Sequence, residues 1–71
     1  MLEIPGIGLQ DVAVIQSLLK SAGFFHRVHH GLGKFNRDRI LIREADLPAI
    51  KEFLRDYRIR NDRGELCAIP W

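Results

Sequence analysis

A basic, histidine-bearing segment is the part of the sequence best suited to contact another molecule. It runs from residue 24 to residue 43 and holds five of the eleven Lys and Arg residues, against one acid, Asp38. Its net charge is therefore +4, whereas the rest of the chain, with six basic and eight acidic residues, sums to −2. Such an asymmetry indicates a contact surface for an acidic protein, a phosphate or a nucleic acid.

The side chains that we expect to make this contact flank a Gly-containing stretch of the segment. Cations suit phosphates and acidic surfaces, and an aromatic ring among them can stack on a base. The C-terminal Trp71 is added because exposed aromatic residues suit interfaces. The predicted partner-binding residues are Arg27, His29, His30, Lys34, Phe35, Arg37, Arg39 and Trp71. The alternatives are a solvated loop without a partner and, for Trp71, a lid over the core or the sheet edge.

The three histidines raise the question of a metal site, which their spacing does not favour. On a strand rising about 3.3 Å per residue, His26 and His30 share a face but stand about 13 Å apart, and His29 points the other way. Metal sites need three or four converging ligands, and no Cys or carboxylate spacing completes such a set. We predict no metal and no cofactor. The histidines can still make the charge of the segment pH-dependent between about pH 5 and 8.

Catalytic chemistry is equally unsupported by the residue pattern. The single cysteine, Cys67, has no paired base in the sequence, as a nucleophile requires. The glycines at positions 31 and 33 precede Lys34, but without the spacing of a phosphate-binding P-loop. We therefore predict that the protein is not an enzyme.

The elements that position these residues follow from hydrophobic periodicity. Residues 9–22 and 44–57 repeat apolar side chains at helical spacing. Asp11 is the expected N-cap of the first helix, and Gly23 its expected end. Residues 24–30 and 39–43 alternate as two strands joined by a long loop. Short strands are expected within residues 1–8 and 65–69, with a polar turn at 59–64.

This order of elements predicts the fold class. The pattern β-α-β-β-α-β is typical of an α+β, ferredoxin-like sandwich with an antiparallel sheet and both helices on one face. Seventy-one residues correspond to a single domain spanning 1–71. The basic segment would then be the hairpin between the second and third strands.

A glycine-rich turn offers another route to nucleic acid. Pro5-Gly6-Ile7-Gly8 resembles the hairpin of the helix-hairpin-helix DNA-binding motif, whose glycines let backbone amides reach a phosphate. That motif also needs a helix before the hairpin, and only four residues precede Pro5. The simpler interpretation is a turn that leads into the first helix.

The helical segments also carry a family resemblance. The run DVAVIQSLLKSAGFF matches an A-x-x-L-x-x-L-L-x-x-A-G helix pattern at Leu18, Leu19, Ala22 and Gly23, with Ala13 one position after the first alanine of the pattern. The run ILIREADLPAIKEFLRDY matches a second pattern, V-L-V-x-x-x-D-L-x-x-A, which leads into the second helix of the family. The matching positions are residues 40–42, Asp46 and Leu47. Over residues 9–57 the chain resembles the family of small prokaryotic signal-transducing proteins. The resemblance implies a fold similar to that of nitrogen-regulatory signal proteins, but no chemistry.

Composition completes the functional prediction. With 46% hydrophobic and 28% charged residues, the chain has the composition of a folded globular protein. It has no apolar run of about 18 residues for a membrane span, and its one cysteine favours a reducing cytoplasm. The resemblance implies that this cytoplasm is bacterial. We predict a non-enzymatic regulatory or adaptor module, in signal transduction, that binds a protein partner through the basic loop. Self-association as a homodimer is left open, and nucleic-acid or phosphate binding is the alternative function.

Overall fold

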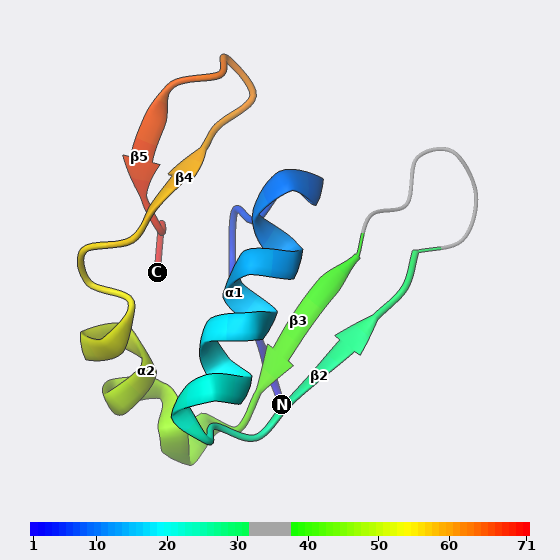
Figure 1. Cartoon of the computed structure of the whole chain (residues 1–71), viewed down its shortest axis with the longest axis vertical. Coiled ribbons are helices and arrows are strands. Elements are labelled where there is room, and N and C mark those ends of the chain that lie inside the picture. The colour runs from blue at the N-terminus through cyan, green and yellow to red at the C-terminus, as the bar shows by residue number, and fades with distance from the viewer. Residues whose placement is uncertain (32–37) are drawn as a thin grey trace.

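The chain forms two antiparallel sheets and two α-helices in a computed structural model, which describes residues 1–31 and 38–71 (Figure 1). The elements in chain order are β1 (Leu2–Glu3), α1 (Leu9–Ala22), β2 (His26–His29), β3 (Arg39–Ile42), the 3-10 turn η1 (Glu44–Asp46), α2 (Leu47–Phe53), β4 (Arg58–Arg60) and β5 (Leu66–Ala68). The predicted α+β class is confirmed.

Helix α1 has the bounds that its apolar period predicts. Gly23 ends it in the left-handed region at φ 81°, and the Phe24 N–H donates to the Leu19 carbonyl at 2.9 Å. The predicted N-cap was wrong, because the cap is Gly8, whose carbonyl accepts the Asp11 N–H at 3.0 Å. Asp11 therefore lies inside the first turn. Its side chain is drawn into a tertiary contact instead of capping the helix.

Strands β1, β3 and β2 form one antiparallel sheet in that spatial order. The pairing sets Leu2 opposite Ile42 and His29 opposite Arg39. On β3, Ile40 and Ile42 are fully buried, whereas Arg39 is exposed. The alternation of a strand thus directs one face of the sheet to the core and the other to solvent. The short first strand does form, and Pro5 lies two residues after its end.

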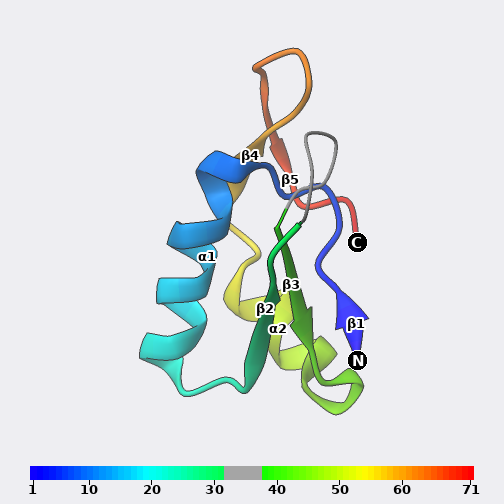
Figure 2. The same ribbon diagram turned by 90° about the vertical axis from the view of Figure 1, so that its right-hand side faces the viewer.

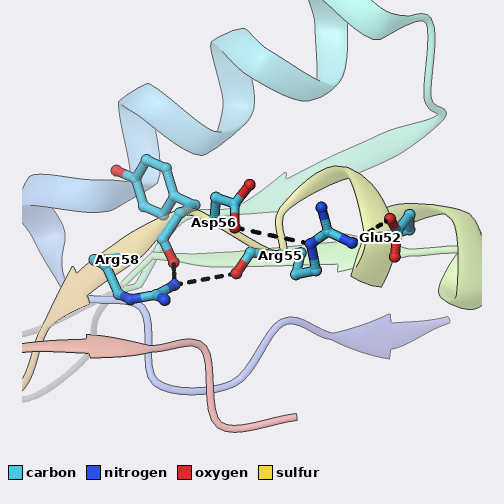
Figure 3. Close-up of polar contacts among 5 residues, drawn as sticks. Glu52, Arg55, Asp56 and Arg58 are labelled. Atoms are coloured by element: carbon cyan, nitrogen blue, oxygen red, sulfur yellow. Dashed lines mark hydrogen bonds and ion pairs between the residues drawn. The ribbon is translucent and has the colours of Figure 1, made fainter.

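The second helix is shorter than its apolar period predicts. The α-helical part ends at Phe53, and a turn occupies residues 54–56. At this end, the Arg58 guanidinium donates to the carbonyls of Arg55 and Tyr57 at 3.0 and 3.3 Å (Figure 3). Arg58 therefore contacts carbonyl groups just beyond the end of α2, where a cation is favoured.

The C-terminal segment differs most from the prediction. Residues 58–60, expected to be largely turn, form β4, which pairs with β5 as a separate two-stranded sheet. The Asn61 side-chain oxygen closes this hairpin by accepting the N–H groups of Arg63 and Glu65 at 2.9 and 3.0 Å. The observed order is thus β-α-β-β-α-β-β, and the ferredoxin-like order is not confirmed. Figures 1 and 2 show the β4–β5 hairpin at the end of the molecule where α1 begins.

One hydrophobic core connects both sheets and both helices. Its buried members are Ile4, Ile7, Val12, Ile15, Leu19, Ile40, Ile42, Ile50, Leu54, Ile59 and Ile69. Phe24 and Phe53 close its rim, with ring centroids 5.5 Å apart. Neither helix in the described part of the chain has the length and apolar character needed to cross a membrane. Every element therefore contributes to a single packing unit that holds the β2–β3 hairpin in place.

Candidate partner-binding site

The solvent-facing side of the β2–β3 hairpin carries the described part of the predicted site. Arg27 and His29 are exposed and alternate with His26 and Val28, which are half-buried. Val28 packs against the core, so the alternation is fixed by burial. Cross-strand register places His29 opposite Arg39, which is also exposed. The structure thus brings Arg27, His29 and Arg39 onto one face, which we call the basic face.

Two residues that sequence reasoning did not assign to the site extend the basic face. The Arg43 guanidinium lies 5.4 Å from the centroid of the Phe25 ring, a cation–π distance. Phe25 is 45% exposed, and Arg43 also donates to Asp46 at 2.8 Å. Both residues follow the strand alternation one step beyond β2 and β3. That alternation is the sequence signal that would have identified them.

Asp38 fixes the base of the loop. One carboxylate oxygen accepts the Gly31 N–H at 3.2 Å, and the other lies 3.3 Å from His30 Nδ1. The His30 side chain is 78% exposed, so this pair is screened by solvent. The only acid of the segment is thus directed at the loop ends. Three predicted site residues, Lys34, Phe35 and Arg37, lie outside the described residues.

The histidines do not converge on a metal. Across residues 1–31 and 38–71, no three His, Cys, Asp or Glu side chains are grouped as metal ligands. His26 Nδ1 lies 3.0 Å from the Phe24 carbonyl oxygen, a local contact that orients the ring. His29 stands on the opposite face of the strand, as its register predicts.

Trp71 lies apart from the basic face. It lines a hollow of about 200 Å³ together with Leu2, Glu3, Pro5, Leu47 and Lys51. Because β1 and β2 are the two ends of the three-stranded sheet, this hollow lies at the opposite edge from β2. The indole is 38% exposed, with Lys51 Nζ 6.0 Å from its centroid. Among the described residues of the predicted site, the structure places Trp71 apart from Arg27, His29 and Arg39.

The glycine-rich turn is occupied by packing. Residues before Pro5 form a strand, so the first helix of a helix-hairpin-helix motif is not formed. A Cβ built on Gly6 would stand 2.8 Å from the Pro70 ring, and Ile7 is 4% exposed. The turn is therefore packed against the C-terminus.

A polar cluster at the start of α1 was not expected from the sequence. The Asp11 carboxylate, 9% exposed, accepts the Tyr57 hydroxyl at 2.9 Å and the Arg60 N–H at 3.2 Å. Partial burial, the hydrogen bond to Asp11 and the Asp11 charge together raise the pKa of Tyr57 to about 12. A hollow of about 330 Å³ lies beside it, lined by residues 8–11, 60–62 and 64. The two hydrogen bonds of Asp11 link α1 to the segment that contains Tyr57 and β4, so the role of this carboxylate is structural.

Arg55 near the end of α2 is engaged in ion pairs within the chain, in contrast to Arg27 and Arg39 of the basic face. Arg55 lies 2.9 Å from a Glu52 oxygen and 3.8 Å from an Asp56 oxygen (Figure 3). Within the described residues, Arg27 and Arg39 thus present positive charge on the basic face without an ion pair. Comparisons with protein-family models, curated proteins and solved structures gave no significant match.

Proposed function

We propose that this protein is a non-enzymatic regulatory or adaptor module that binds a protein partner through the basic face. The observation that carries the proposal is the exposure of Arg27, His29 and Arg39 on one side of a sheet whose other side is buried in the core. Electrostatic complementarity of such a surface steers an acidic partner and fixes its orientation. Signal transduction in a bacterial cytoplasm is the setting that we propose for this binding.

A ferredoxin-like relationship belongs to the same proposal. The first strand lies beside the third, antiparallel to it, as in a split β-α-β unit. The β4–β5 hairpin would then stand in place of the single fourth strand. In this arrangement the helices serve the core, and the opposite face of the sheet is available for binding.

A charge-reversal pair tests the proposed surface. The variant Arg27→Glu, Arg39→Glu should lose the proteins that the wild type captures from a bacterial lysate, as measured by quantitative pull-down. A matched control, Arg55→Glu, Arg63→Glu, makes the same change in net charge at exposed positions away from the basic face. We expect at least about tenfold weaker capture for the first variant and little change for the control. Equal capture by both variants would reject the basic face as the binding surface.

Nucleic-acid binding by the same face is the second candidate. Phe25 favours it, because an exposed ring beside cations on a sheet can stack on an unpaired base. A complex with about four phosphate contacts should show a log–log salt slope near −3 to −4. Fluorescence anisotropy with single-stranded DNA and RNA across a salt series measures this slope. No affinity for either at low salt would remove this candidate.

A further inference from the structure

We propose that the outer edge of β2 binds an extended acidic segment of the partner by adding it to the sheet as a fourth strand. This inference rests on the proposed function and specifies the binding mode and the chemistry of the partner. Strand β2 is the last strand on its side of the sheet, and no strand of the described chain pairs with its outer edge. Addition of a strand to such an edge is a common mode of peptide recognition.

The hydrogen-bond pattern identifies which backbone groups would bind. The Ile4 N–H donates to the Ile40 carbonyl at 3.0 Å, so Ile40 directs its backbone groups toward β1. Because alternate residues of an antiparallel strand face opposite neighbours, Arg39 and Leu41 direct theirs toward β2. Their register partners on β2 are His29 and Arg27.

The remaining residues of β2 therefore present its outer edge. The N–H and C=O groups of His26 and Val28 point away from β3, where an added strand would meet them. The register of β2 with β3 runs without interruption from residue 26 to residue 29, so no bulge twists this edge away. The strand also has no proline. A bulge and a proline are two features that usually prevent an edge strand from pairing with another strand, and β2 has neither.

The positive charge of β2 favours an acidic segment as the strand that pairs with its outer edge. Strand β2 has no acidic residue and carries Arg27 between two histidines, with Arg39 beside it on β3. An incoming strand with Glu or Asp on its solvent-facing side would meet Arg27 across the new pair. A second copy of the chain fits poorly. Of the two registers with the greatest overlap allowed by the outward groups of His26 and Val28, one sets Arg27 opposite another Arg27, and like charges directly opposite destabilise a pair. The other sets Arg27 opposite His29, which supplies no acidic partner for it.

Amide hydrogen exchange followed by NMR tests the inference directly, with a peptide of alternating Glu and Val as the probe. In the free protein, the Arg27 and His29 amides should be protected by β3, and those of His26 and Val28 should exchange rapidly. Saturating peptide should slow exchange at His26 and Val28 by at least about tenfold and leave the other two unchanged. The same peptide N-methylated on its central amides, and a Lys-Val peptide, should not do so.

Two substitutions at one position supply the matched control. Val28→Pro removes an outward N–H without removing a bond to β3, a position where an edge strand tolerates proline. Val28→Ala shortens the same side chain and keeps the N–H. We expect peptide affinity to fall at least about tenfold for Val28→Pro relative to Val28→Ala, with both variants folded by circular dichroism.

The outcomes separate this inference from the proposed function. One outcome is that Arg27→Glu weakens binding of the acidic peptide, whereas N-methylation of the peptide and Val28→Pro do not. This outcome would overturn strand addition and keep the basic face as the binding surface. If no peptide binds while a single-stranded oligonucleotide does, the face belongs to nucleic acid and the inference fails. Equal binding of the Glu-Val and Lys-Val peptides would overturn the acidic partner. No binding of either peptide, together with unchanged lysate capture by Arg27→Glu, Arg39→Glu, would overturn both proposals.

Discussion

Asp11 is a largely buried carboxylate that joins residues 46 and 49 positions away in the chain. Its oxygens accept the Tyr57 hydroxyl and the Arg60 N–H, so it links α1 to β4. A carboxylate inside the first turn of a helix also interacts favourably with the positive end of the helix dipole. Removing one partner of such a group leaves the other without compensation, at a cost of about 1–3 kcal/mol.

The pH dependence of stability should report on this contact. The pKa of Tyr57 is raised from 10.0 to about 12 in the folded protein, so its stabilising effect is complete below pH 10 and is lost as the pH rises toward 12. Tyr57→Phe should be less stable than the wild type at neutral pH by about 1–2 kcal/mol, and the difference should narrow between pH 10 and 12. Urea denaturation of both proteins at each pH measures it.

A spectroscopic control is available because Tyr57 is the only tyrosine of the chain. Tyrosinate absorbance in the ultraviolet therefore titrates this hydroxyl alone. An apparent pKa of Tyr57 near 10 in the native protein would contradict the Asp11 contact, whatever the stability data show. Lysine titration is common to both proteins and cancels in the comparison.

At the scale of elements, the turn after β1 is held by the C-terminus. Gly6 combines a left-handed backbone, φ 75°, with close approach to the Pro70 ring, whereas Gly23 is left-handed with open space around it. The two glycines therefore separate conformational cost from steric cost. Their positions lie at opposite ends of α1.

Alanine at each glycine should show this difference. Gly23→Ala is expected to destabilise the protein by about 1 kcal/mol, the usual cost of a left-handed residue with a side chain. Gly6→Ala should cost about 1–3 kcal/mol more, because the new methyl group overlaps Pro70. Chemical denaturation of both variants measures the difference. Equal loss would show that the C-terminal segment moves aside freely and does not secure the turn.

At the scale of the molecule, the two sheets belong to one cooperative unit. Within residues 1–31 and 38–71, the β4–β5 hairpin has no hydrogen-bonded ladder with the three-stranded sheet, yet Ile59 and Ile69 join the core that also contains Ile40 and Ile50. A two-stranded hairpin is marginal in water without such packing. Its stability therefore depends on the shared core.

Truncation of the buried Ile59 side chain should consequently destabilise the whole molecule. Ile59→Ala should lower the free energy of unfolding by about 2–4 kcal/mol, whereas Leu66→Ala, at a 62% exposed position of the same hairpin, should change it by less than about 0.5 kcal/mol. Thermal unfolding followed by circular dichroism and by the fluorescence of the single Trp71 should show coincident transitions. Two separate transitions would contradict a shared core.

Local sequence patterns were sufficient to predict the elements in which apolar residues recur at a regular spacing. The bounds of α1, its Gly23 terminus, and the alternation that sets Ile40 and Ile42 on one face of β3 were predicted, because each depends on short-range spacing. The exposed placement of Arg27, His29 and Arg39 follows from the same alternation. For Lys34, Phe35 and Arg37, which lie outside the described residues, the site assignment stays a prediction.

Contacts between distant segments decided the rest. The sequence by itself determined an α+β chain with an amphipathic first helix and a basic hairpin, because apolar period and charge are local properties. Only the tertiary structure decided that α2 ends at Phe53, that residues 58–60 pair with β5, that Asp11 turns to Tyr57, and that Trp71 lies at the β1 edge. The placement of Asp11 and that of Trp71 depend on partners far away in the chain. A prediction from the spacing of residues within a short stretch of sequence cannot include such a distant partner.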